Sequence, residues 1–312
     1  MLFHKYFINI LDRYVFRIFT IHVILPPKRR QMFYHFMRFM VRISLHFYNK
    51  RIGWEGVENI PTNKPILFTV THSNSFLDAL YIAASLKQGV YCLARGDAFR
   101  KPLANKILRH FKVLPIFRQS EQSENAVLKN KKTFDECQEL FRKNEWVLIF
   151  PEGYCTNQTK VMPLKKGFIS MAQRAWAEDI DVHIVPVSIT YDSFSKWGKK
   201  CDVIFGKSIQ KIDIQGDEEE KERQLNEMLY TRLSENFPSP LQFRGENLLW
   251  GLLGQWMYYV GRVFQFPVYL LSQYLGKRLT HGTVFYDSAI VGLLSVLLIF
   301  YYAFLGILWA SY

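Results

Sequence analysis

Cysteine is scarce in this chain and is not placed where it could form a disulfide framework or bind a metal ion. Four cysteines occur in 312 residues, at positions 92, 137, 155 and 201, and none belongs to a Cys-x-x-Cys motif or a Cys/His cluster. This scattering argues against a disulfide-stapled fold and a zinc site, and it fits a reducing compartment. The chain is 49% hydrophobic, which excludes a disordered protein, and its aromatic fraction of 16% indicates contact with lipid or an interface.

Acidic residues are almost absent from the first 51 residues. Asp12 is the only acid there, against ten basic residues, so this segment carries +9 of the net charge of +13. Between Met32 and Phe47, apolar residues recur every three or four positions with Arg38 and Arg42 on the other side, which predicts a basic amphipathic helix. Such a helix suits a membrane interface, where cations meet anionic headgroups. The alternatives are a helix packed on the protein's own core and a nucleic-acid-binding arm, but an arm this apolar is a poor reader of a phosphate backbone.

Charge is also absent from the C-terminal end. The last 25 residues are uncharged and long enough to cross the hydrocarbon core of a bilayer. We therefore expect a transmembrane helix around residues 288–311. The apolar stretch before it, residues 247–276, is interrupted only by Arg262 and Pro267. It fits a kinked span, a re-entrant hairpin or an interfacial helix.

Charged residues beside the apolar stretches indicate how the chain is oriented. Lys277 and Arg278 separate the two C-terminal stretches, and basic residues favour the cytoplasmic side, so we expect the middle of the chain there. At the other end, Arg13 and Arg17 interrupt the apolar stretch and no small-residue cleavage site follows. We therefore do not expect the first 25 residues to be a signal peptide.

Strand-like and helix-like patterns alternate in the middle of the chain. Short apolar runs predict strands, and stretches with helical periodicity predict helices between them. The expected strands are 65–71, 89–93, 113–117, 146–150 and 182–190, with 203–205 as a further edge strand. The expected helices are 75–86, 101–111, 126–142, 167–177 and one that begins near residue 216. This alternation predicts an α/β fold with a mixed sheet covered by helices and with its chemistry at the strand ends.

The first candidate site follows the strand at 65–71. His72 ends that apolar run, and Asp78 falls in the first turn of the next helix. A carboxylate there can accept the imidazole Nδ1 proton, which fixes the tautomer and leaves Nε2 free to take a proton from a hydroxyl. A purely structural aspartate is the alternative, because acids are favoured near helix N-termini.

The second candidate follows the strand at 146–150. Pro151 ends the strand and Gly153 permits a tight turn, so Glu152 is displayed at the carboxyl end of the strand. An ordinary strand-to-loop turn is the alternative interpretation.

The third candidate is cationic. Arg118 follows the strand at 113–117, and Lys165 with Lys166 opens the helix at 167–177. An arginine fork and a helix N-terminus both suit phosphate oxygens. The alternative is surface charge exposed to solvent.

Taken together, these clusters indicate a class of reaction. No Gly-x-Ser-x-Gly nucleophile motif accompanies the histidine, so the attacking hydroxyl belongs to the substrate. A cation for phosphate implies an anionic acceptor, and membrane elements imply a lipid product. A thioester donor needs little help from an acid because a thiolate leaves readily. The sequence therefore predicts transfer of an acyl chain to a hydroxyl of a phosphate-bearing lipid precursor.

The order of the motifs resembles the four blocks of the glycerolipid acyltransferase family, which includes glycerol-3-phosphate and 1-acylglycerol-3-phosphate acyltransferases. The matching blocks, within about residues 53–207, are His72 with Asp78, Leu114–Arg118, Phe150–Gly153 and Ile184–Val187.

The resemblance implies that His72 and Asp78 are a catalytic pair, and that Arg118, Glu152 and Gly153 bind the glycerol phosphate of the acceptor. Pro186 would shape the pocket behind them. It also implies an acyl-CoA or acyl-carrier-protein donor, with no other cofactor and no metal. The expected partners are a lipid bilayer, this donor and a glycerophosphate-type acceptor, with no nucleic acid.

The expected division of the chain follows from these patterns. Residues 1–50 would form basic amphipathic interface helices, residues 51–243 the acyltransferase α/β domain, and residues 244–312 a membrane-associated segment. The protein would lie at a membrane with its catalytic domain on the cytoplasmic side.

Three features depart from the family's pattern. Five residues, rather than the common four, separate His72 from Asp78, Lys112 stands where a glycine is usual, and Tyr154–Thr156 replaces the usual Thr-Arg-Ser. The missing arginine makes four other cations candidates for phosphate binding: Lys165, Lys166, Arg95 and Arg100.

Two rival functions follow from the sequence. In the first, Cys155 is the nucleophile of a thioester hydrolase or an acyl-enzyme transferase. In the second, the chain is a non-catalytic membrane-binding protein that keeps an acyltransferase fold with a misspaced pair.

Overall fold

The computed structural model describes residues 26–117, 125–235, 237, 248–280 and 283–311. The prediction that the N-terminus is not a signal peptide concerns residues 1–25, which lie outside these ranges.

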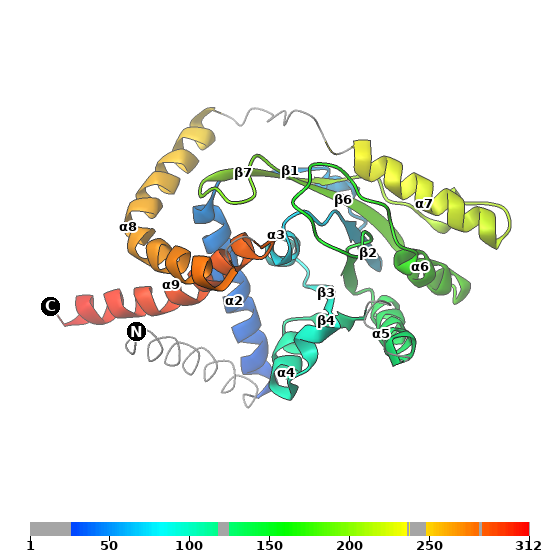
Figure 1. Cartoon of the computed structure of the whole chain (residues 1–312), viewed down its shortest axis with the longest axis horizontal. Helices are drawn as coiled ribbons and strands as arrows, with labels where there is room; N and C mark the ends of the chain where they lie inside the picture. Colours follow the sequence, from blue (N-terminus) through cyan, green and yellow to red (C-terminus); the bar gives the residue numbers. More distant parts are fainter. Residues whose placement is uncertain (1–25, 118–124, 236, 238–247, 281–282, 312) are drawn as a thin grey trace.

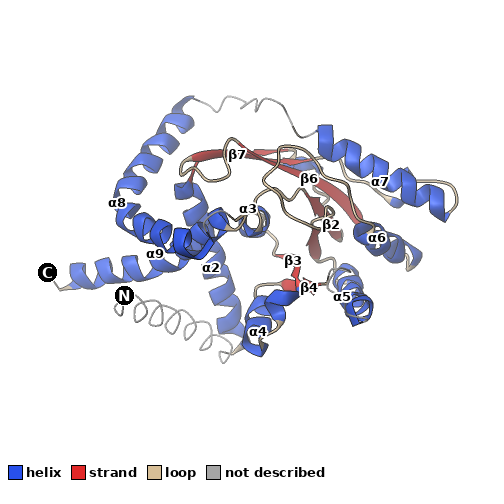
Figure 2. Ribbon diagram, in the orientation of Figure 1, coloured by secondary structure: helices blue, strands red, loops and turns tan. Residues whose placement is uncertain are grey.

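In the described part of the chain, seven strands form one mixed sheet at the centre of the molecule (Figures 1 and 2). Their spatial order is β1-β7-β6-β2-β5-β3-β4, with β6 and β7 antiparallel and every other neighbouring pair parallel. The strands are β1 (Asn49–Glu55), β2 (Ile66–Val70), β3 (Val90–Arg95), β4 (Val113–Ile116), β5 (Trp146–Ile149), β6 (His183–Tyr191) and β7 (Lys199–Phe205). The predicted fold class is confirmed.

Helices cover both faces of the sheet. One face carries α3 (Phe76–Ser85) together with α2 (Pro27–Tyr48), α8 (Leu248–Thr280) and α9 (Tyr286–Ala310). The opposite face carries α5 (Asn125–Arg142), α6 (Gly167–Ala177) and α7 (Glu218–Glu235), on the right in Figure 1. The short helix α4 (Pro102–His110) lies beside β4 at the sheet edge.

The central strand β2 shows why the sequence forms this three-layer structure. Its five residues are all buried, as expected for a continuous apolar run in a sheet covered on both faces. Ile66, Phe68 and Val70 belong to the core on the α3 side, and Leu67 belongs to the core on the α6 side. Because β2 is parallel to both β5 and β6, the loops that follow these three strands leave from the same edge of the sheet.

The predicted set of strands needs two corrections. The segment at 203–205 is not an edge strand, because β7 lies between β1 and β6. The edge position is taken by β1, which no sequence pattern predicted. Most of its residues are only half-buried, and it follows α2 with no intervening turn, so it shows neither a continuous apolar run nor a turn signal.

The N-terminal helix α2 is partly a core helix. Its buried residues include Met37, Met40 and Tyr48. Arg38 is half-buried and Arg42 is exposed, and both guanidinium groups reach the end of a neighbouring helix. They donate to the carbonyl oxygens of Ala83 (2.9 Å) and Ala84 (2.8 Å) at the end of α3. Other apolar side chains of α2 remain exposed: Met32, Phe36 and Phe39.

The C-terminal segment consists of two packed helices. Residues 247–276 are not a hairpin, because α8 runs continuously from Leu248 to Thr280 with Pro267 inside it. Among the described residues, α9 is the one helix long and apolar enough to cross a membrane, with a mean hydropathy of 2.5. Its 25 residues agree with the predicted span at 288–311.

Candidate active site

His72 and Asp78 lie side by side at the carboxyl edge of the sheet. His72 follows β2, and Asp78 is in the first turn of α3. The His72 Nδ1 atom is 3.1 Å from Asp78 Oδ2, the Asp78 side chain is fully buried, and the His72 side chain is 17% exposed. Since the carboxylate accepts the Nδ1 proton, Nε2 is the nitrogen left to receive a proton from a substrate.

The Asp78 carboxylate is held by two further donors. The backbone N–H of Asn74 donates to Oδ2 at 2.9 Å, and the Tyr191 hydroxyl donates to Oδ1 at 2.5 Å. Burial raises the pKa of Tyr191 well above its ordinary value, so the hydroxyl keeps its proton and acts as a donor. Sequence reasoning missed Tyr191. Its one signal was its position at the carboxyl end of β6, next to β2.

The unusual spacing does not separate the pair. The five-residue loop from Ser73 to Leu77 contains Ser75, whose φ of 52° and ψ of −136° place it in a region that residues other than glycine rarely adopt. The Ser75 N–H donates to Cys155 Sγ at 2.9 Å. This unusual backbone conformation at Ser75 accompanies the extra residue, and the histidine lies within hydrogen-bond reach of the aspartate.

The imidazole ring is also held from its face. Phe150, the residue after β5, stacks on His72 with ring centroids 3.8 Å apart and an angle of 16° between the planes. Hydrogen bonding at Nδ1 and stacking on the ring leave the imidazole little freedom to rotate.

Glu152 lies beside the histidine because β5 and β2 are parallel neighbours. Its Oε1 accepts a hydrogen bond from the backbone N–H of His72 at 3.2 Å. The turn that places it there needs Gly153, whose φ is 73°. Glu152 is buried, and this burial raises its pKa to about 7; the His72 N–H lowers the pKa and the charge of Asp78 raises it further.

Replacing Glu152 by glutamine should stabilise the protein at alkaline pH. A folded-state pKa near 7, above the ordinary 4.5, means that folding favours the protonated carboxyl. The stabilisation is complete below about pH 4.5 and is lost as pH rises through about 7. Because glutamine mimics the protonated form, Glu152→Gln should exceed wild type at pH 8 by up to about 3 kcal/mol, and match it near pH 4.5.

Melting temperatures from pH 5 to pH 8 measure this difference. Glu58→Gln, at an exposed position in the short helix η1 (Val57–Asn59), is the control and should show no pH-dependent gain. A constant offset between Glu152→Gln and wild type across this range would contradict the prediction.

The two predicted lysines have different neighbours. Lys165 lies next to the acidic turn: its backbone N–H donates to Pro151 O at 2.7 Å, and its side chain passes over Gly153. Lys166 instead pairs with Glu222 of α7 at 2.7 Å. Of the two lysines, Lys165 is thus the better placed to meet a ligand beside Glu152.

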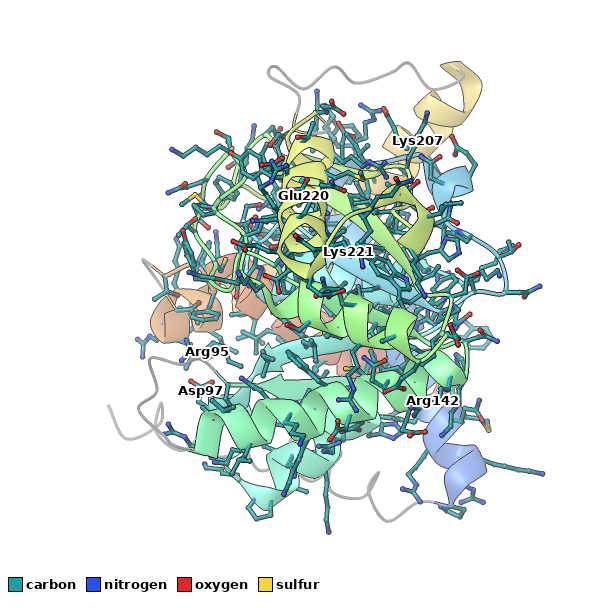
Figure 3. All side chains as sticks on the ribbon, turned by 90° about the vertical axis from the view of Figure 1, so that its right-hand side faces the viewer. Arg95, Asp97, Arg142, Lys207, Glu220 and Lys221 are labelled. Atoms are coloured by element: carbon teal, nitrogen blue, oxygen red, sulfur yellow. The ribbon has the colours of Figure 1, made fainter. Side chains whose placement is uncertain are left out.

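Two further predicted cations, Arg95 and Arg100, lie at or just beyond the end of β3. Arg95 pairs with Asp97 at 2.5 Å, side by side in Figure 3, and Arg100 is exposed at the end of the short helix η2 (Gly96–Phe99). Arg118 lies outside the described residues. Within the described residues, no group of three or more His, Cys, Asp or Glu side chains could hold a metal ion.

Comparisons with known proteins relate part of the chain to one family. The family described as Acyltransferase matches residues 51–190. The chain is 29% identical over 169 residues to the chloroplastic 1-acyl-sn-glycerol-3-phosphate acyltransferase BAT2 of Brassica napus, covering 54% of this chain and 45% of that protein. It is 28% identical over 120 residues to lysophosphatidylcholine acyltransferase 1 of Rattus norvegicus, covering 38% of this chain and 21% of that protein. The chain thus spans less than half the length of these curated relatives.

A solved structure shares the fold. The crystal structure of the 1-acyl-sn-glycerophosphate acyltransferase PlsC from Thermotoga maritima superposes with a TM-score of 0.53 at 18% identity, covering 77% of this chain and 95% of that chain. The superposed share of the chain is larger than residues 51–190, and at this identity the likeness is one of fold.

Proposed function

Because residues 51–190 place this chain in the acyltransferase family, we propose that it moves a fatty acyl chain from a thioester donor to a hydroxyl of a lysophospholipid-type or glycerol 3-phosphate acceptor. One observation carries the proposal: His72 is hydrogen-bonded to the buried Asp78 at 3.1 Å, at the strand edge that also displays Glu152.

The geometry supports a direct transfer from donor to acceptor, without an acyl-enzyme, with the histidine as general base. His72 Nε2 takes the proton from the acceptor hydroxyl as its oxygen attacks the thioester carbonyl. The tetrahedral intermediate then collapses with loss of the thiolate, which receives the proton from the imidazolium. An ester and a free thiol result. Asp78 stabilises the imidazolium that forms between these two steps.

The exposed apolar helices supply a place for lipid substrates. α9 is apolar along its length, and its second half exposes large side chains that include Phe304 and Trp309. α8 exposes further large side chains on its side of the molecule, among them Val263 and Phe264. A bilayer covering these helices would hold the enzyme where its amphipathic acceptor resides, with the catalytic domain on the cytoplasmic side.

An acceptor panel tests the proposal. The full chain in phospholipid vesicles is given acyl-CoA or acyl-carrier protein together with glycerol 3-phosphate, 1-acylglycerol 3-phosphate or lysophosphatidylcholine. Thiol release that depends on one of these acceptors is expected. Absence of release with every donor and acceptor would favour the non-catalytic rival.

Replacing Cys155 should separate the proposal from the cysteine-nucleophile rival. The Cys155 sulfur accepts the backbone N–H of Ser75, which gives it a role in holding the loop. Cys155→Ser keeps an acceptor atom, so we expect thiol-release activity within about threefold of wild type. A loss as large as that of His72→Ala would instead identify Cys155 as the nucleophile.

A further inference from the structure

The first turn of α9 is hydrogen-bonded to the loop that carries the catalytic pair. Asp287 Oδ2 accepts from the Asn74 side chain at 2.8 Å, and Ser288 Oγ accepts from the backbone N–H of Leu77 at 2.9 Å. The Ser288 hydroxyl in turn donates to Asn74 O at 3.3 Å. Three contacts thus join the start of the candidate membrane span to residues 74–77, more than 200 positions earlier in the chain.

Asn74 connects this contact directly to Asp78. Its backbone N–H donates to Asp78 Oδ2 at 2.9 Å, while its side chain donates to Asp287. One residue therefore holds the catalytic carboxylate on one side and the α9 carboxylate on the other. A shift of Asp287 would move Asn74 and, through it, the acceptor of the His72 proton.

A second connection runs through Lys199. Its ammonium forms a buried ion pair with Asp287, and it lies 5.7 Å from the centre of the Tyr191 ring, whose hydroxyl donates to Asp78. Tyr48 adds a hydrogen bond to Asp287 Oδ1 at 2.5 Å. All five residues of this connection are at least nine-tenths buried: Tyr48, Asp78, Tyr191, Lys199 and Asp287.

The burial of this network indicates that it contributes more than folding stability. A buried ion pair costs desolvation energy that its attraction only partly repays, and an apolar contact between α9 and α3 would bury the same surface without that cost. Hydrogen bonds depend on orientation, so the polar network fixes residues 74–77 at a defined position relative to α9.

We propose that Asp287 is a positioning residue for acyl transfer: through Asn74 and Lys199 it fixes the catalytic loop, so that the seating of α9 sets the geometry of the His72–Asp78 pair. This rests on the proposed function, because the pair must be catalytic for its geometry to affect turnover.

Two variants and a control test the proposal in the full chain in phospholipid vesicles. Asp287→Asn removes the charge that pairs with Lys199 and leaves one acceptor oxygen where Tyr48, Asn74 and Lys199 now share two. Ser288→Ala removes the acceptor for the Leu77 N–H without changing charge. The control is Ser295→Ala, a buried α9 residue whose hydroxyl donates to its own helix at Val291 O, 2.8 Å.

Each variant is measured in three ways. Thiol-release kinetics give kcat and KM, amide hydrogen exchange reports on the peptide spanning residues 72–78, and the melting temperature reports on folding. We expect Asp287→Asn to lower kcat about 10–100-fold with donor KM within about twofold, since misplacement of catalytic groups costs turnover rather than binding. Exchange in the 72–78 peptide should become faster.

Ser288→Ala should lower kcat and speed exchange in the 72–78 peptide, each by about 3–10-fold. Ser295→Ala should change neither kcat nor exchange. Because it is neutral, Ser288→Ala keeps the test decisive if Asp287→Asn fails to fold. Wild-type kcat and wild-type exchange in a folded Ser288→Ala protein would overturn the proposal. A wild-type protein without acyltransferase activity would refute the proposed function alone, because the exchange measurement still reports whether α9 holds the loop.

Discussion

His72→Ala is expected to lower kcat by about 10³–10⁴-fold and to leave the protein folded. The imidazole is the one group of the catalytic pair with a nitrogen left for the acceptor hydroxyl, since its Nδ1 is held by Asp78. Its side chain is 17% exposed, so its removal opens no large internal cavity. Without it the hydroxyl must attack while still carrying its proton.

Thiol release with the best acceptor of the panel measures this effect. His46→Ala is the matched control, because His46 is exposed on α2 and its ring contacts only the Arg42 carbonyl of its own helix among the described hydrogen bonds. The control should retain wild-type turnover. Turnover of His72→Ala within about threefold of wild type would show that the imidazole does not act as the base.

Asp78→Asn is expected to lower kcat by about 10³-fold with little change in donor KM. The Asp78 carboxylate accepts from His72 Nδ1, the Asn74 N–H and the Tyr191 hydroxyl, all three of them donors. An amide offers one acceptor oxygen and turns an N–H₂ group toward a donor, so the imidazole loses its orientation and the imidazolium loses its counter-charge.

The same substitution should also reduce stability, because a fully buried group loses hydrogen bonds. Asp97→Asn is the matched control: Asp97 is partly exposed and pairs with Arg95 (Figure 3), so its loss should cost less than about 1 kcal/mol and leave kcat unchanged. If Asp78→Asn kept wild-type kcat while the melting temperature fell, Asp78 would be a structural residue only.

The sheet was predictable where burial on both faces gave a clear pattern. β2 and β5 appear as continuous apolar runs, and each predicted element between residues 65 and 190 is present within a few positions. β1 was not predictable, because a half-buried edge strand shows no such run. The position of β7 inside the sheet depends on that missed strand.

The candidate site was predictable from residues that follow neighbouring parallel strands. His72 and Glu152 meet because β2 and β5 are adjacent, a consequence of topology once both strands are recognised. Tyr191 and Asp287 were not predictable, since their contacts to Asp78 and Asn74 join residues 113 and 213 positions apart. No local pattern encodes such pairings.

The arginines of α2 also show that a sequence pattern does not determine tertiary contacts. Helical periodicity placed Arg38 and Arg42 on one face, which was expected to meet lipid headgroups or, in the alternative, water. In the structure this face meets the C-terminus of α3, whose last carbonyl groups have no partners within their own helix. Periodicity indicates which residues share a face, and only the tertiary fold determines what that face contacts.

The identity of the product tests the central claim most directly. The wild-type chain in vesicles is incubated with acyl-CoA and the preferred acceptor, and the released thiol and the lipid product are both quantified, the latter by mass spectrometry. Acyl transfer with His72 as base predicts one new ester on the acceptor for each thiol released, and neither product from His72→Ala above background. Free fatty acid in place of the ester would mean that water, not the acceptor hydroxyl, attacks the thioester, and would contradict the account.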